Sequence, residues 1–157
     1  MYDVAAMFTD VPLNETIEVL VDKAFMDAWF NKTHDFNLEI AQLVELLKFA
    51  TTKQLLQFDG NLYEQLDNVA VGSPLGPLMA NSFICCNEEG LYEQGLIPSY
   101  NRRYMDDTLV IMPDVKAAED FLTTLNYSHS DMKFTMVLVV NDKTSFVAMD
   151  IIKSPCP

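Results

Sequence analysis

The feature that most constrains this chain is a pair of adjacent carboxylates, Asp106 and Asp107, between two apolar runs. The run before ends in Tyr104 and Met105, and the run after covers residues 109–112. Short apolar runs around a polar pair predict two strands joined by a turn. Like charges at a turn raise each other's pKa unless a cation neutralises them, and carboxylate oxygens suit Mg²⁺ or Mn²⁺. Taken alone, however, the pair is more simply an acidic surface turn.

Length and charge set limits on the class of protein. With 157 residues, half of them apolar, the chain is most simply one domain with one core. Its net charge is −13, and residues 1–101 carry 15 acidic but only 4 basic side chains. An acidic surface repels phosphate, so composition speaks against a nucleic-acid binder that acts in isolation.

Cysteine usage and hydropathy indicate the compartment. The three cysteines, Cys85, Cys86 and Cys156, support neither a disulfide framework nor a zinc site. No secretory signal opens the chain, and glycines and prolines interrupt the uncharged run over residues 69–86. We therefore expect a soluble, intracellular protein, nuclear or cytoplasmic, with no membrane partner.

Hydrophobic spacing and turn signals predict the order of the elements. Strands are expected at 2–8, 55–58, 62–66, 134–140 and 145–152, besides the two around Asp106, and helices at 14–28, 40–50, 78–94 and 115–126. Residues 31–35 form a polar break, and residues 141–143 are expected to turn between the last two strands. This order predicts an α+β fold, with a mainly antiparallel sheet and helices packed on one face.

A third carboxylate, Asp3, lies on the first predicted strand. If that strand pairs with the hairpin of Asp106 and Asp107, three carboxylates meet at one rim of the sheet. Two metal ions about 4 Å apart, clamped by shared carboxylates, perform phosphoryl transfer in many enzymes. Three acids suffice for such a site.

Three segments carry a resemblance to a known family. They run from Asp3 to Leu13 (DVAAMFTDVPL), from Gln65 to Pro77 (QLDNVAVGSPLGP) and from Tyr104 to Asp107 (YMDD). In this order they resemble the first three palm motifs of reverse transcriptases, closest to those of Penelope-like retroelements. Weaker downstream likenesses follow at residues 134–135 and 146–151. Three motifs in register are more specific than one, and they reverse the preference for a surface turn.

The resemblance implies an RNA-directed DNA polymerase with a palm-type sheet and part of the fingers. Residues 1–157 would be one partial domain that lacks the upstream fingers and the downstream thumb. Its partners would be an RNA or DNA template with primer and deoxynucleoside triphosphates, and its cofactors two Mg²⁺ or Mn²⁺ ions. Missing segments or a partner chain would be needed, so the chain alone is not expected to synthesise DNA at an appreciable rate.

The same resemblance assigns the metal ligands. Asp3 and Asp106 would be the main ligands of the two ions, Asp107 would support them, and the backbone carbonyl of Val4 is a further candidate ligand. The three aspartates form the expected catalytic set.

For the nucleotide, the resemblance places Phe8 under the sugar, where its ring would exclude a 2′-hydroxyl. Without the resemblance, a core phenylalanine is an equally good interpretation. Gln65 and the Gly72-Ser73-Pro74 turn would border the nucleotide and the template.

Several positions depart from the family pattern or stay open. Asn68 stands where the family usually has glycine, and residues 136–140 are apolar where it has acidic residues. Lys133 and Lys143 are both candidates for the downstream lysine. Arg102 and Arg103 fit either a contact with template phosphate or a solvated pair at a strand end.

Two other functions remain open. One is a decayed, catalytically inactive remnant that acts at most as a folded interaction module, which the acidic charge favours. The other is a different metal-dependent nucleotidyl enzyme, such as a cyclase, which the second motif argues against.

Overall fold

The computed structural model describes residues 1–8, 10–52, 55–65, 73–139 and 143–152. Its contacts divide the chain into two compact units. The sheet unit comprises Met1–Met7 and Asn87–Pro157, and the helical unit comprises Phe8–Cys86. The expectation of a single domain over residues 1–157 stays a prediction.

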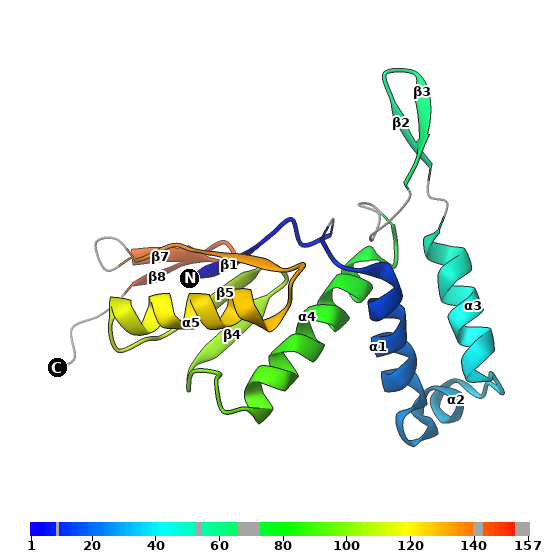
Figure 1. The fold of residues 1–157 in the computed structure, drawn as a ribbon, viewed down its shortest axis with the longest axis horizontal. Helices are drawn as coiled ribbons and strands as arrows, with labels where there is room; N and C mark the ends of the chain where they lie inside the picture. The colour runs from blue at the N-terminus through cyan, green and yellow to red at the C-terminus, as the bar shows by residue number, and fades with distance from the viewer. Residues whose placement is uncertain (9, 53–54, 66–72, 140–142, 153–157) are drawn as a thin grey trace. The chain divides into compact units, whose positions relative to one another are not determined.

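The sheet unit is built on a four-stranded sheet with the order β4-β5-β1-β6 (Figure 1). All neighbouring strands are antiparallel. The strands are β1 (Tyr2–Ala5), β4 (Asn101–Tyr104), β5 (Asp107–Val110) and β6 (Lys133–Met136). The hairpin predicted around Asp106 is therefore confirmed, and the strand of Asp3 pairs with it.

Helix α5 (Val115–Ser128) packs on one face of this sheet (Figure 1). The Asp114 carboxylate caps its first turn by accepting a 2.7 Å hydrogen bond from the Ala117 amide. Phe121, buried on the inner side of α5, meets the Tyr2 ring edge-on at 5.4 Å, and the Tyr2 hydroxyl donates to the Ala118 carbonyl at 2.8 Å. The predicted α+β class, with an antiparallel sheet and helical cover, is confirmed.

The C-terminal strands pair differently from the expectation. Residues 145–152 were expected to form one strand, but β7 (Lys143–Phe146) and β8 (Met149–Ile152) pair with each other. The turn between them is Val147-Ala148, with φ of 50° and 58°. Neither residue type favours positive φ, so the sequence carries no turn signal there. An ion pair of 2.7 Å between Lys143 and Asp150 links the two strands. Strand β6 ends at Met136, before the predicted end at Val140, which lies outside the described residues.

The helical unit begins with α1 (Leu13–Phe25), which buries Leu13, Thr16, Ile17, Val21 and Ala24 on one face and packs on α3 (Ile40–Thr51). The helix is shorter than expected because the short 3₁₀ turn that follows it, η1 (Met26–Ala28), contains a residue with positive φ, Asp27, at 54°. The polar break expected at residues 31–35 was wrong: α2 (Trp29–His34) forms there, and His34 contacts the rings of Trp29 and Phe30.

Three further elements, two strands and a helix, follow the expectation closely. Strands β2 (Leu55–Phe58) and β3 (Asn61–Glu64) form the predicted hairpin, with φ of 49° at Asp59 and 76° at Gly60 in its turn. Helix α4 (Gly76–Glu93) begins two residues before its predicted start, and the boundary between the two units falls within it. No described helix combines the length and the apolar character that a membrane crossing requires.

Candidate functional site

The register between β1 and β5 sets the geometry of the candidate site. Asp3 lies directly opposite Asp107, and Tyr2 lies opposite Thr108. Residues directly opposite in an antiparallel pair have their Cβ atoms about 4.5–5.5 Å apart on the same face. The side chains of Asp3 and Asp107 therefore start from neighbouring points of one face.

That face is the one that α5 leaves open. Tyr2 and Val4, on either side of Asp3, are 2% and 4% exposed, and Thr108, next to Asp107, is 5% exposed. Because side chains alternate along a strand, Asp3 and Asp107 point away from the buried face. Asp106 is exposed in the two-residue turn between β4 and β5, where its backbone carbonyl accepts a hydrogen bond from the Val4 amide at 3.1 Å.

The electrostatics of Asp3 reflect this grouping. The pKa of the Asp3 carboxyl is raised above its ordinary value. Burial is the largest cause, and the negative charges of Asp106 and Asp107 are the smaller causes. The Asp3 charge thus interacts with both other charges. A cation among them would relieve both the repulsion and the cost of burying the Asp3 charge.

The donor chemistry fits Mg²⁺ or Mn²⁺, which prefer carboxylate and carbonyl oxygens. Val4 can offer only its backbone carbonyl oxygen. Its side chain is apolar and buried, and its amide already donates to the Asp106 carbonyl. Within the described residues, no three His, Cys, Asp or Glu side chains are arranged as a ready-made metal cage. The site is therefore a shared rim of acids, from which side-chain rotation would have to bring the oxygens together.

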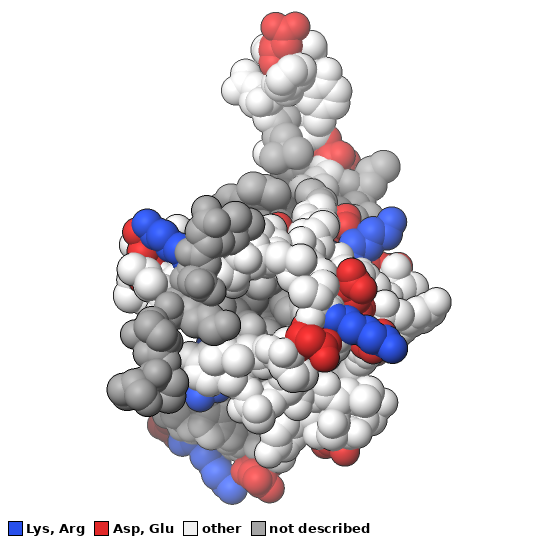
Figure 2. All heavy atoms as spheres, turned by 90° about the vertical axis from the view of Figure 1, so that its left-hand side faces the viewer, with Lys and Arg blue, Asp and Glu red and all other residues white. Residues whose placement is uncertain are grey.

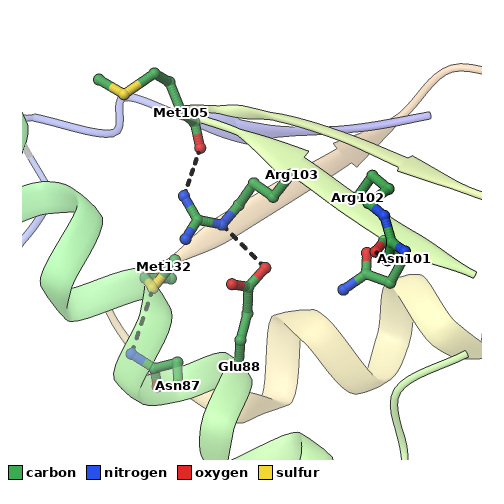
Figure 3. A network of polar contacts seen from close by, with 7 residues as sticks. All are labelled: Asn87, Glu88, Asn101, Arg102, Arg103, Met105 and Met132. Atoms are coloured by element: carbon green, nitrogen blue, oxygen red, sulfur yellow. Dashed lines mark hydrogen bonds and ion pairs between the residues drawn. The ribbon is translucent and has the colours of Figure 1, made fainter.

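Two residues outside the expected set hold the hairpin turn (Figure 3). The Arg103 guanidinium forms a 2.9 Å ion pair with Glu88 of α4 and donates to the Met105 carbonyl at 3.0 Å. Arg103 is thus not a solvated strand-end residue. Arg102, in contrast, is exposed, with its guanidinium 5.1 Å from the Tyr100 ring centroid. No sequence pattern predicted the role of Glu88, because the sequence of a helix does not show which of its acidic residues will pair with an arginine of another element.

The two candidate lysines differ in their surroundings. Lys133 lies opposite Ala5 in the β1–β6 register, and Thr135 lies opposite Asp3. Lys133 is exposed and shares a face with Asp3, one side-chain step along the strand. Lys143 is engaged with Asp150 on the β7–β8 hairpin. The geometry favours Lys133 as the cation beside the carboxylates.

The expected nucleotide-binding residues belong to the helical unit, whereas the three carboxylates belong to the sheet unit. Phe8 and Gln65 are half-buried and Pro74 is exposed. The Ser73 hydroxyl accepts a hydrogen bond from the Leu75 amide at 3.3 Å. Gly72 lies outside the described residues.

Comparisons with protein-family models, with curated proteins and with solved structures found no match for this chain.

Proposed function

We propose that this chain is the palm of an RNA-directed DNA polymerase, with part of the fingers, that extends a primer 3′-hydroxyl with deoxynucleoside triphosphates. The observation that supports the proposal most is the direct pairing of Asp3 with Asp107. Two segments about a hundred residues apart in the chain supply the acids that phosphoryl transfer requires.

In this proposal the acids hold two divalent cations. Asp3 and Asp106 are the main ligands, Asp107 supports them, and the Val4 carbonyl completes the set. When bound, Mg²⁺ or Mn²⁺ activates the attacking hydroxyl and stabilises the leaving oxygen. Lys133, exposed on the same face, is suited to attract the triphosphate.

The substrate side of the proposal rests on the resemblance of the first two motifs. Phe8 supports the sugar and excludes a 2′-hydroxyl, while Gln65, Gly72, Ser73 and Pro74 border the nucleotide and the template. Primer and template bind with the help of further segments or a partner chain, because the acidic composition supplies few cations for phosphate.

The proposal is tested by the binding of deoxynucleoside triphosphate with Mn²⁺, followed by fluorescence anisotropy of a labelled nucleotide. Asp3→Asn should weaken this binding about tenfold or more, since it removes a charged ligand. Asp131→Asn, which changes an exposed acid after α5, is the matched control. Equal binding by the wild type and Asp3→Asn would count against the polymerase site.

Phe8 provides a separate test of the nucleotide assignment. Phe8→Ala should reduce the preference for deoxy- over ribonucleotides in the same binding assay, because it removes bulk at the sugar but no metal ligand. Unchanged selectivity would return Phe8 to the role of an ordinary core side chain.

The alternative is a catalytically inactive remnant that serves as a folded interaction module. Its specific support is the β2–β3 hairpin, which exposes Phe58 (73%) and Leu62 (68%) as a binding module would. The absence of a preformed three-ligand cage among the described residues points the same way. Under this alternative, neither metal nor nucleotide binds at Asp3.

A further inference from the structure

The Arg103–Glu88 pair is an unusual feature of the sheet unit because both charges are largely removed from water. The Arg103 side chain is 8% exposed and that of Glu88 is 26% exposed, at a distance of 2.9 Å. Buried charges are costly unless they are paired and hydrogen-bonded. Glu88 therefore holds the guanidinium in one place, where its remaining N–H groups can reach other partners.

One of those groups binds the hairpin turn. Nη1 of Arg103 donates to the Met105 carbonyl at 3.0 Å (Figure 3). This carbonyl belongs to the peptide unit that joins Met105 to Asp106, so the hydrogen bond fixes the peptide plane that leads into Asp106. Met105 itself has a φ of 55°, which a non-glycine residue adopts only when its surroundings hold it there.

The turn is also held from its other side. The Val4 amide donates to the Asp106 carbonyl at 3.1 Å, beside the pair of Asp3 and Asp107. The two hydrogen bonds fix successive carbonyls of the turn, that of Met105 from β4 and that of Asp106 from β1. Loss of the first would release the strained peptide and thereby loosen the second.

We propose that Arg103, oriented by Glu88, is a positioning residue that sets the place of Asp106 relative to Asp3. The planar guanidinium joins a carboxylate and a carbonyl at fixed directions, which the single ammonium of lysine does not. The importance of this position for metal binding rests on the proposed function. The positioning itself does not, and the experiment separates the two.

The first arm measures backbone amide hydrogen exchange by NMR without metal. Arg103→Gln should make the Val4 amide exchange about tenfold faster, while the amides of α5 keep their rates. Glu88→Gln should also speed exchange of the Val4 amide, but by a smaller factor. Arg102→Gln, which changes the exposed neighbour, should leave this exchange rate unchanged. Unchanged protection of Val4 in both Arg103→Gln and Arg103→Lys would overturn the proposal.

A charge swap separates positioning from general stabilisation. Glu88→Arg/Arg103→Glu keeps an ion pair but leaves the side chain at position 103 without an N–H group that could donate to the Met105 carbonyl. We expect the swap to recover thermal stability relative to Arg103→Gln while the Val4 amide still exchanges fast. Recovery of Val4 protection in the swap would show that the ion pair alone acts, and the positioning role would be wrong.

The second arm measures Mn²⁺ affinity by electron paramagnetic resonance. Arg103→Gln should weaken Mn²⁺ binding about fivefold or more, because misplaced ligands lose affinity, and Arg102→Gln should not. An Mn²⁺ affinity that Asp106→Asn leaves unchanged would refute the proposed function while the Val4 result still stands. Equal Mn²⁺ affinity in Arg103→Gln and the wild type, with Asp106→Asn weakened, would overturn the link from Arg103 to the site.

Discussion

At the scale of single residues, Asp3 is the most informative side chain. It sits between two buried neighbours on a strand and opposite another acid, and its pKa is raised. Such a residue weakens the fold at neutral pH, because the folded state favours the protonated form that neutral water does not. Under the proposed function, a cation bound at Asp3 would offset this cost.

Asp3→Asn should therefore raise the melting temperature of the metal-free protein at pH 7. The pKa of Asp3 is higher in the folded state than in the unfolded state. The ionised Asp3 therefore lowers the free energy of unfolding in full above the folded-state pKa. This loss of stability vanishes below about pH 4, where Asp3 becomes protonated in both states. Thermal melts from pH 3.5 to 7.5 measure the gain. Asp22→Asn, on the exposed side of α1, serves as the control. A gain that persists undiminished at the lowest pH would contradict this assignment of the cause.

At the scale of the elements, amphipathic helices and strong turn residues could be predicted from the sequence. The spacing in α1 and α3 and the Asp59-Gly60 turn led to the right elements because each signal is local. The Val147-Ala148 turn could not be predicted, since both residues disfavour the positive φ that they adopt there. A similar limit applies to α2, which ring contacts around His34 stabilise.

Substitutions in the turn of the β7–β8 hairpin should stabilise this hairpin. Val147→Asn/Ala148→Gly introduces the residue pair that positive φ at both positions prefers. The gain should be about 1 kcal/mol, seen as roughly fivefold slower amide exchange across the hairpin. Asp59→Asn, in a turn that is already favourable, should change exchange in β2 and β3 little. Faster exchange in the double variant would mean that the turn is held in another conformation.

At the scale of the whole molecule, charge is the main constraint on function. On the face shown in Figure 2, the described lysine and arginine side chains are scattered and not gathered into a stripe. With 23 acidic and 10 basic residues, the chain repels a phosphate backbone. The grouping of Asp3 with Asp107 was predictable from motif order, whereas the support by Glu88 and Arg103 was not, because it depends on which helix face packs behind the hairpin.

We predict that this chain alone extends a primer poorly, even with Mn²⁺ at low salt. Phosphoryl transfer depends on positioning and charge stabilisation, and few cations are present to supply either for the template. Primer extension on gels, at rising salt, measures this. Robust extension that Asp106→Asn abolishes would show that the chain needs no partner segment.

The central claim is that Asp3, Asp106 and Asp107 form a divalent-cation site. Thermal melts with and without millimolar Mn²⁺ test it most directly, on the wild type, on Asp106→Asn/Asp107→Asn, and on Glu119→Gln/Asp120→Asn, which neutralises an adjacent exposed acidic pair on α5. Binding to the folded state alone stabilises it, by roughly 2.7 kcal/mol at a hundred times the dissociation constant. The account predicts a rise in melting temperature for the wild type and the α5 variant, and none for Asp106→Asn/Asp107→Asn. An equal rise in all three proteins, or no rise in the wild type, would contradict it.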